Sequence, residues 1–299
     1  MEESDLVEES GDGLEQQLFN ACRVGDIEEV QQLLYNPQIN IYWQNNKGQT
    51  FFFTACENGW IDIVRLLLKD ERTKVNKAEN LFAHTPFYAA CWKGNVDVVR
   101  LLLKDERVDV NKECVFGTPF HTACYNGHVE IVKLLINDRR IDTNKENVNK
   151  RTPFYYACWE EQTDVVKFLL NHQRTIDINK VDGEGMTPFY VACRTGNIDI
   201  VKYILASRRE VDLTVKDIYG NSAINIVKEK SEKPFGGFES EKTFENRRSR
   251  FKYIFELLES FERSPNETRF KLRKELDLAG TSIVIFFFFK KTNIFNSRW

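Results

Sequence analysis

The sequence is poor in the side chains that usually carry catalysis or bind metals. Its 299 residues include only four histidines, and no two of them stand at the spacing of a metal-binding pair: His84, His121, His128 and His172. No glycine-rich phosphate loop is present, since Gly236-Gly237 is not followed by Lys-Ser or Lys-Thr. The sequence therefore predicts no catalytic residue, no metal ligand, no cofactor and no enzymatic activity.

Long apolar runs are also absent. The longest, residues 283–289, has seven residues, whereas a bilayer-spanning helix needs about 20, so no transmembrane anchor is expected. Three interpretations of residues 283–291 stay open: interfacial membrane contact aided by Lys290 and Lys291, an aggregation-prone edge, or an error of gene prediction.

Basic residues are missing from positions 1–13, which hold six acidic ones and no apolar core. We therefore expect no signal peptide. The formal net charge of the whole chain is -3, so nothing attracts it to nucleic acid in general.

Cysteine is well represented, and its placement is periodic. Six of the seven cysteines follow an alanine, at intervals of 34, 35, 33, 34 and 35 residues: Cys22, Cys56, Cys91, Cys124, Cys158 and Cys193. Neighbouring packed helices lie about 8–10 Å apart, which is too far for a disulfide and for a shared zinc ion. We expect buried, reduced thiols and a reducing compartment, the cytoplasm or alternatively the nucleus.

Each cysteine belongs to the same repeating unit, clearest between residues 85 and 111. Thr85-Pro86 suits the start of a helix, because threonine caps backbone amides and proline lacks only an N–H that would be unpaired there. Gly94 ends this helix, and a second helix follows over residues 96–103. The extended stretch 108–111 then leads to the next Thr-Pro. Each unit thus predicts a helix, a turn, a second helix and a projecting finger.

The recurring pattern Thr-Pro-Phe-Tyr/His-x-Ala-Cys, then Gly-x-x-Asp/Glu-Ile/Val-Val-Lys/Arg-x-Leu-Leu, then Asp-Val-Asn, resembles the ankyrin repeat family. The resemblance implies an all-α solenoid of stacked helix pairs with β-hairpin fingers. It covers residues 14–230, as six full units and a partial seventh. An acidic disordered segment (1–13) precedes them, and a loop with C-terminal capping helices (231–278) and an apolar irregular tail (279–299) follow.

Two departures from the family pattern affect the repeats. The usual histidine is kept only at His121 and is tyrosine at Tyr88, Tyr155 and Tyr190, so its hydrogen-bonding role is in doubt in most units. Glu161 stands where other units have glycine. If that position requires a left-handed backbone, Glu161 costs about 1–2 kcal/mol and weakens the fifth repeat.

The resemblance also implies a function, since ankyrin modules generally bind other proteins on their concave face and are not catalysts. We expect a monomeric scaffold or adaptor whose partner is another protein. The position after each cysteine is aromatic in three consecutive units, with a charged residue at either end, and apolar finger tips lie beside it. The predicted partner-binding residues are Trp92, Tyr125, Trp159, Glu57, Arg194, Phe82 and Phe116. The alternative is that these rings only pack against neighbouring fingers.

A second possible function involves the C-terminal helices. The protein could be a substrate receptor of a ubiquitin ligase, with the repeats selecting the target and the helices docking the machinery. We expect a helix from about Glu241 and another opened by a Ser264–Glu267 capping box. The basic cluster on the latter, in contact with an acidic partner or simply exposed to solvent, is Arg269, Lys271, Arg273 and Lys274.

Arginine also recurs in the outer loops, as Arg72, Arg107, Arg140, Arg174 and Arg209. Because acidic residues stand beside most of these arginines, we expect local charge neutralisation and no acidic-partner site there.

Overall fold

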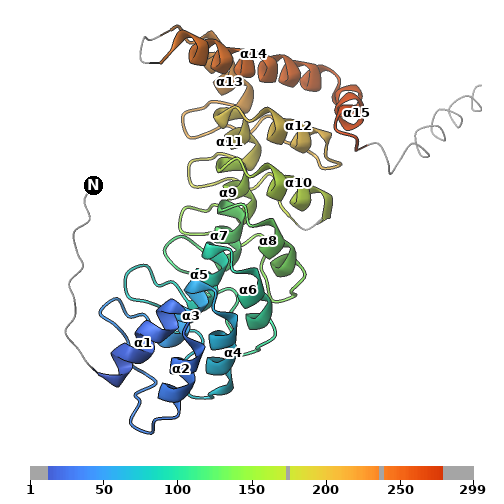
Figure 1. Cartoon of the computed structure of the whole chain (residues 1–299). Coiled ribbons are helices and arrows are strands. Elements are labelled where there is room, and N and C mark those ends of the chain that lie inside the picture. Colours follow the sequence, from blue (N-terminus) through green and yellow to red (C-terminus); the bar gives the residue numbers. More distant parts are fainter. Residues whose placement is uncertain (1–12, 173–175, 236–238, 279–299) are drawn as a thin grey trace, which may run out of the picture. The chain divides into compact units, whose positions relative to one another are not determined.

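The computed structural model describes residues 13–172, 176–235 and 239–278. These residues form fifteen helices and no named β-strand (Figure 1). The chain divides into two compact units, residues 1–153 and 154–299. Residues 1–12 of the acidic N-terminal segment and the whole apolar tail lie outside the described residues.

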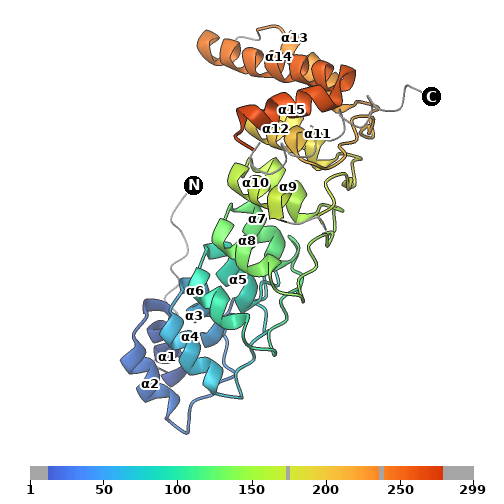
Figure 2. The ribbon, with the colours of Figure 1, turned by 90° about the vertical axis from the view of Figure 1, so that its right-hand side faces the viewer.

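The first unit contains four helix pairs, as the repeat pattern predicts. Its first helices pack on one another in chain order, and its second helices form a parallel outer row (Figure 2). The pairs are α1 (Leu14–Val24) with α2 (Ile27–Leu34), α3 (Phe51–Asn58) with α4 (Ile61–Lys69), α5 (Pro86–Lys93) with α6 (Val96–Leu102), and α7 (Pro119–Tyr125) with α8 (Val129–Ile136).

The second unit continues the pattern and then closes it. Helix α14 lies along α13, and α15 packs against both α14 and α12, so these long helices cover the apolar end of the repeats. The elements are α9 (Pro153–Trp159), α10 (Thr163–His172), α11 (Pro188–Thr195), α12 (Ile198–Ala206), α13 (Ala223–Glu232), α14 (Glu241–Arg263) and α15 (Pro265–Glu275).

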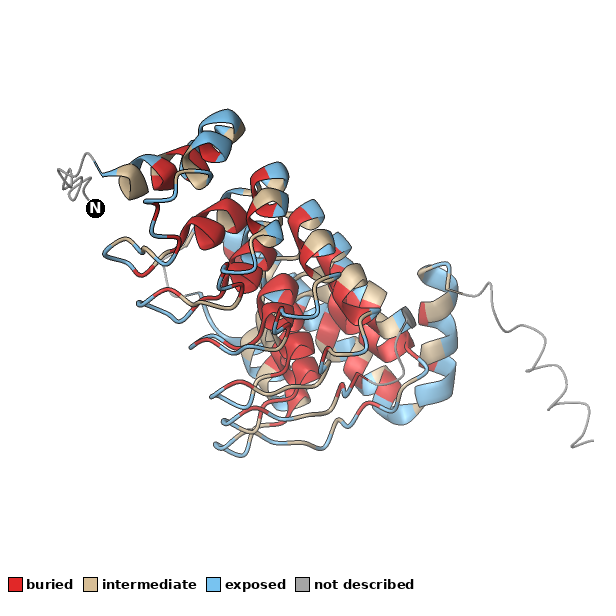
Figure 3. Cartoon of the chain, turned by 90° about the horizontal axis from the view of Figure 1, so that it is seen from below, coloured by how far each residue is buried: buried red, intermediate tan, exposed pale blue. Residues whose placement is uncertain are grey.

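The Thr-Pro motif and the Ala-Cys pair act as predicted. The Thr85 hydroxyl accepts the N–H of Tyr88 and starts α5, while Ala90 and Cys91 are fully buried. Buried residues face the helix–helix contacts along the stack (Figure 3). All seven cysteines are buried and none forms a disulfide. Burial raises the pKa of the Cys22 thiol to about 12, so these thiols pack as small apolar groups.

Glu161 has the strained backbone that the repeat alignment predicts. Gly59 and Gly94 both have φ 80° where their first helices end, and Glu161 has φ 56° at the equivalent position. A side chain with a Cβ atom is disfavoured in this region, whereas glycine is not. The fifth repeat therefore carries a cost that its neighbours avoid.

The fingers differ from the expected β-hairpins. In the described residues they contain only isolated bridges, Cys114–Gly117 and Lys216–Ser222. One side chain per finger instead accepts backbone N–H groups across the turn, as Asn45 does from Lys47 and Gln49, and this replaces ladder bonding. The equivalent positions are Asn45, Glu79, Cys114, Asn147, Asp182 and Asp217. The seventh cysteine thus belongs to a finger turn.

Adjacent repeats are joined by side chains that reach back to helix ends. The Trp60 indole N–H donates to the Arg23 carbonyl at 3.1 Å, and the Asn95 amide donates to the Glu57 carbonyl at 2.9 Å. These bonds satisfy carbonyls that a helix leaves unpaired at its C-terminus. They also hold the residues beside the buried cysteines in place.

Three of the outer-loop arginines are neutralised locally, as expected, whereas Arg209 donates to the Ile176 carbonyl. Ion pairs of 2.6 Å join Arg72 to Asp70 and Arg107 to Asp105, and a 2.7 Å pair joins Arg140 to Asp138. Arg107 also donates to the Leu68 carbonyl at 2.9 Å, near the end of α4. Arg174 lies outside the described residues.

The C-terminal helices correct two predictions. Ser264 has φ -146° and ψ 73° and makes no side-chain cap, because the same residue also terminates α14 through a backbone bond to Ser260. The predicted capping box is therefore absent, and Glu267 pairs with Lys271 at 2.9 Å.

The basic cluster of α15 is also partly used inside the fold. Arg273 donates to the Ala206 carbonyl at 3.2 Å, and Arg269 donates to the Leu205 carbonyl at 3.3 Å. Both carbonyls belong to the C-terminal end of α12, which attracts positive charge. These two arginines join α15 to the last complete repeat, and Lys271 and Lys274 are the exposed members of the cluster.

Candidate partner-binding surface

Five rings gather where the third repeat meets the fourth, in the first unit. We call them the aromatic cluster: Phe82, His84, Tyr88, Trp92 and Phe116. The His84 ring is central. It stacks on Tyr88 with ring centroids 4.4 Å apart and lies 5.5 Å from Trp92 and 5.9 Å from Phe116. Phe82 and Phe116, from successive fingers, are 5.5 Å apart.

Three rings of the cluster face solvent. Phe82 is 39% exposed, Trp92 40% and Phe116 50%. Leu81 and Val115 are exposed beside them on the same two fingers. The Val115 N–H points to the Phe82 carbonyl at 3.4 Å, which keeps the two finger tips together. The result is an exposed apolar surface that rests on a base formed by the buried rings of His84 and Tyr88.

Glu79 holds the finger that carries Phe82 in shape. Its carboxylate accepts backbone N–H groups from Leu81 at 2.6 Å, Phe82 at 2.7 Å and His84 at 3.0 Å. Burial opposes ionisation of Glu79, but these donors prevail and its pKa lies below the ordinary value. The finger is thereby fixed around a charged residue that is itself buried.

His84 was not among the predicted site residues. Its side chain is buried, its Nε2 has no hydrogen-bond partner among the residues that the structure describes, and its Nδ1 lies 3.9 Å from the Glu79 carboxylate. Burial lowers the pKa of His84, against the opposing pull of Glu79. The one available sequence signal was finger length: Glu79 pairs with His84, five residues on, whereas Asn45 pairs with Gln49, four on.

The remaining predicted residues of the first unit, Tyr125 and Glu57, occupy the position of Trp92 in the two neighbouring repeats. Tyr125 ends α7 and is 43% exposed. Glu57 is half-buried on α3, where burial raises its pKa. The Lys93 ammonium lies 4.6 Å from the centre of the Trp92 ring. The apolar surface therefore has a charged border.

The predicted residues of the second unit contact each other. The Arg194 guanidinium lies 5.0 Å from the centre of the Trp159 ring, and the Tyr155 ring centre lies 5.8 Å from that of Trp159. Trp159 is half-buried as a result. The structure thus brings together Phe82, Trp92 and Phe116 in one unit, and Trp159 with Arg194 in the other.

The described residues contain no group of histidine, cysteine or acidic side chains that could hold a metal ion. Within the same ranges, no helix combines the length and the apolar character needed to cross a membrane.

Comparisons with known proteins agree with the architecture. A family model described as ankyrin repeats in three copies matches residues 18–114 and 106–182, and one described as ankyrin repeats in many copies matches residues 169–227. No curated protein matches the chain significantly. Among solved structures, the human ASB11 ankyrin repeat domain aligns with a TM-score of 0.62 and 22% identity, over 77% of this chain and 96% of that one. The chain therefore belongs to the ankyrin repeat family.

Proposed function

We propose that this protein is a scaffold or adaptor that captures another protein through its aromatic cluster and Tyr125. Ankyrin repeats generally mediate protein–protein interactions. The observation that carries the proposal is the grouping of three exposed rings, Phe82, Trp92 and Phe116, on one supported base. Tryptophan and other large rings dominate binding energy where they form a compact centre.

The base is rigid, which favours binding. Phe82 is held by the Glu79 turn, and Trp92 rests on the buried ring of His84. Little conformational entropy is then lost when a partner covers these rings. The chemistry fits an apolar anchor of the partner, with Glu57 and Lys93 contacting polar groups around it. Trp159 with Arg194 forms a further proposed contact, on the second unit.

Affinity capture tests the proposal. Trp92→Ala and Phe116→Ala should each weaken capture of the partner by about tenfold, while the melting temperature changes by no more than about 2 °C. Trp159→Ala tests the second contact in the same way. Tyr35→Ala is the matched control, because Tyr35 is an exposed ring on the first repeat, outside the cluster. Equal losses of stability and capture would instead show that the rings serve internal packing.

A ubiquitin-ligase substrate receptor is the second candidate, and one observation favours it. Phe270 is 61% exposed on α15, between the buried residues Thr268 and Leu272. An exposed ring there is available for docking machinery. If a ligase subunit copurifies with the protein and Phe270→Ser removes it while Lys274→Ser does not, the receptor function is supported. Capture of a target with no ligase subunit leaves the scaffold function.

We further propose that the protein acts as a monomer in the cytoplasm or nucleus and needs no cofactor. The seven buried cysteines without disulfides are consistent with a reducing compartment.

A further inference from the structure

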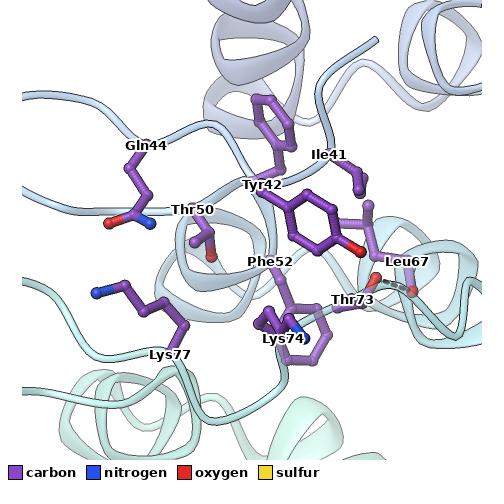
Figure 4. Close-up of a pocket in the computed structure, with 10 residues that line it drawn as sticks. Ile41, Tyr42, Gln44, Thr50, Phe52, Leu67, Thr73, Lys74 and Lys77 are labelled. Atoms are coloured by element: carbon purple, nitrogen blue, oxygen red, sulfur yellow. Dashed lines mark hydrogen bonds between the residues drawn. The ribbon is translucent and has the colours of Figure 1, made fainter.

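A cavity of about 200 Å³ lies between the first and second repeats, within the first unit (Figure 4). Its floor is apolar and is made by the buried side chains of Ile41, Phe52 and Leu67. Tyr42, Lys74 and Lys77 stand around its opening. The cavity is separate from the aromatic cluster and shares no lining residue with it.

The cavity coincides with a missing inter-repeat bond. Tyr42 occupies a repeat position that is asparagine in later repeats. There the asparagine side chain bonds to backbone groups of the next repeat, an arrangement that we call the asparagine clip. Asn76 donates to the Arg107 carbonyl at 2.7 Å and accepts the Asp109 N–H at 2.8 Å, and Asn179 does the same to Glu210 and Asp212. In the first repeat this position is Tyr42, which has no carboxamide to offer.

The backbone groups that the clip would satisfy are consequently unpaired. Counting along the repeat, Arg72 corresponds to Arg107, and Lys74 to Asp109. Neither the Arg72 carbonyl nor the Lys74 N–H has a hydrogen-bond partner within the described residues. One residue of an extended peptide can donate to the first group and accept from the second, as in a parallel bridge.

The charge at the opening selects an acidic peptide. Lys74 and Lys77 form no ion pair within the residues that the structure describes, and the Lys74 ammonium lies 5.5 Å from the centre of the Tyr42 ring. The cavity thus combines an apolar floor, a pair of free backbone groups and two free cations. A matching ligand is an extended segment with an aliphatic side chain between carboxylates.

We propose that the occupant is the chain's own N-terminal segment, with Leu6 in the cavity and its acidic neighbours beside Lys74 and Lys77. The aliphatic pair Leu6-Val7 is flanked by Glu2, Glu3, Asp5, Glu8, Glu9 and Asp12. The segment completes at Arg72 and Lys74 the bonding that asparagine completes elsewhere.

The N-terminal segment can reach the cavity because the chain attaches it to α1 close by. Glu15, in the first turn of α1, accepts the Asn40 N–H at 3.0 Å, only two residues before Tyr42. The eight Cα-to-Cα steps from Leu6 to Leu14 span up to about 26 Å when the chain is extended. A short tether of this kind holds the segment at an effective concentration in the millimolar range.

Photo-cross-linking in the full chain tests the proposal. With p-benzoylphenylalanine in place of Leu6, irradiation should join that position to residues 41–77 of the same chain, as mapped by mass spectrometry. Lys74→Glu with Lys77→Glu should reduce this product about fivefold. Lys104→Glu with Lys112→Glu, which reverses the charge of two exposed lysines of the next repeat, should leave it unchanged.

Tyr42→Asn separates displacement from misfolding. This change supplies the missing clip, so the cross-link should be lost while the melting temperature stays equal or rises. The proposal is overturned if the products map outside residues 41–77, if they survive Lys74→Glu with Lys77→Glu, or if none forms. Cross-links between isotopically light and heavy copies would assign the cavity to a second chain and also overturn it. None of these results bears on the aromatic cluster.

Discussion

The Tyr190 hydroxyl donates a 2.7 Å hydrogen bond to the Asp217 carboxylate, which ties α11 to the finger that follows the sixth repeat. Tyr155 makes the same bond to Asp182 at 2.8 Å. His121 reaches the next finger differently, from Nε2 to the Arg151 carbonyl at 3.0 Å. Tyr155 and Tyr190 therefore supply a hydrogen bond to the next finger where the family's usual histidine is absent. Each bonds to the aspartate whose carboxylate holds that finger turn.

Tyr190→Phe should lower the free energy of unfolding of the second unit by about 2 kcal/mol, because the bond is made to a charged acceptor. Urea unfolding measures the change. Tyr219→Phe is the control, since Tyr219 is an exposed tyrosine of the same finger. Equal effects of the two substitutions would show that the hydrogen bond contributes nothing.

His121 should make stability depend on pH. Burial lowers its pKa from 6.5 to about 4, and its Nδ1 accepts the Thr118 N–H at 3.1 Å. The unfolded chain therefore binds a proton there that the folded chain does not. Stability falls as the pH drops below about 6.5, with a loss on the order of 3 kcal/mol near pH 4.

Two variants separate the contribution of His121 to the pH dependence of stability from that of the carboxylates. His121→Tyr introduces the residue found at this position in three other repeats. The denaturation midpoint of this variant should depend less on pH between pH 6.5 and pH 4. His128→Asn, which introduces the residue found at Asn95 in the preceding repeat, is the control for replacing a histidine. A parallel pH profile for wild type and His121→Tyr would refute the prediction.

Glu161→Gly should stabilise the second unit by about 1 kcal/mol, because glycine removes the left-handed strain. The substitution also removes a 3.1 Å hydrogen bond from the Asn197 amide to the Glu161 carboxylate. Asn197→Ala, made in both backgrounds, measures that loss. Gly196→Ala should act in the opposite sense, since its added Cβ would stand 2.9 Å from the Phe251 ring. Thermal denaturation distinguishes the two outcomes, and a destabilised Glu161→Gly would contradict the strain argument.

Arg273→Ala should loosen α15 from α12. The substitution removes the bond to the Ala206 carbonyl, and a buried acceptor left without its donor costs about 1–2 kcal/mol. Amide hydrogen exchange in residues 265–275 should become faster. Lys274→Ala, an exposed neighbour, serves as the control, and identical exchange in both variants would show that Arg273 does not hold the helix.

The repeat register could be predicted because it depends on local chemistry. Thr85-Pro86 starts a helix and Gly94 ends one wherever the chain goes afterwards, and the Ala-Cys pair marks the packed face. The individual binding residues could also be found, since Trp92 follows Cys91 in a known register. His84 could not, because its importance comes from surrounding rings on two other segments, α5 and the next finger.

The sequence by itself determined the register of the repeat, the Thr-Pro starts and glycine ends of its first helices, and which residues face the stack, because capping, periodicity and residue size act within a few positions. Only the tertiary structure decided which groups meet between repeats. Tyr42 and Asn76 occupy the same repeat position. Tyr42 lines the cavity between the first two repeats, whereas Asn76 forms hydrogen bonds to the next repeat. The difference arises from backbone groups some 30 residues away, at Arg72 and Arg107, whose pairing depends on the stacking of whole repeats.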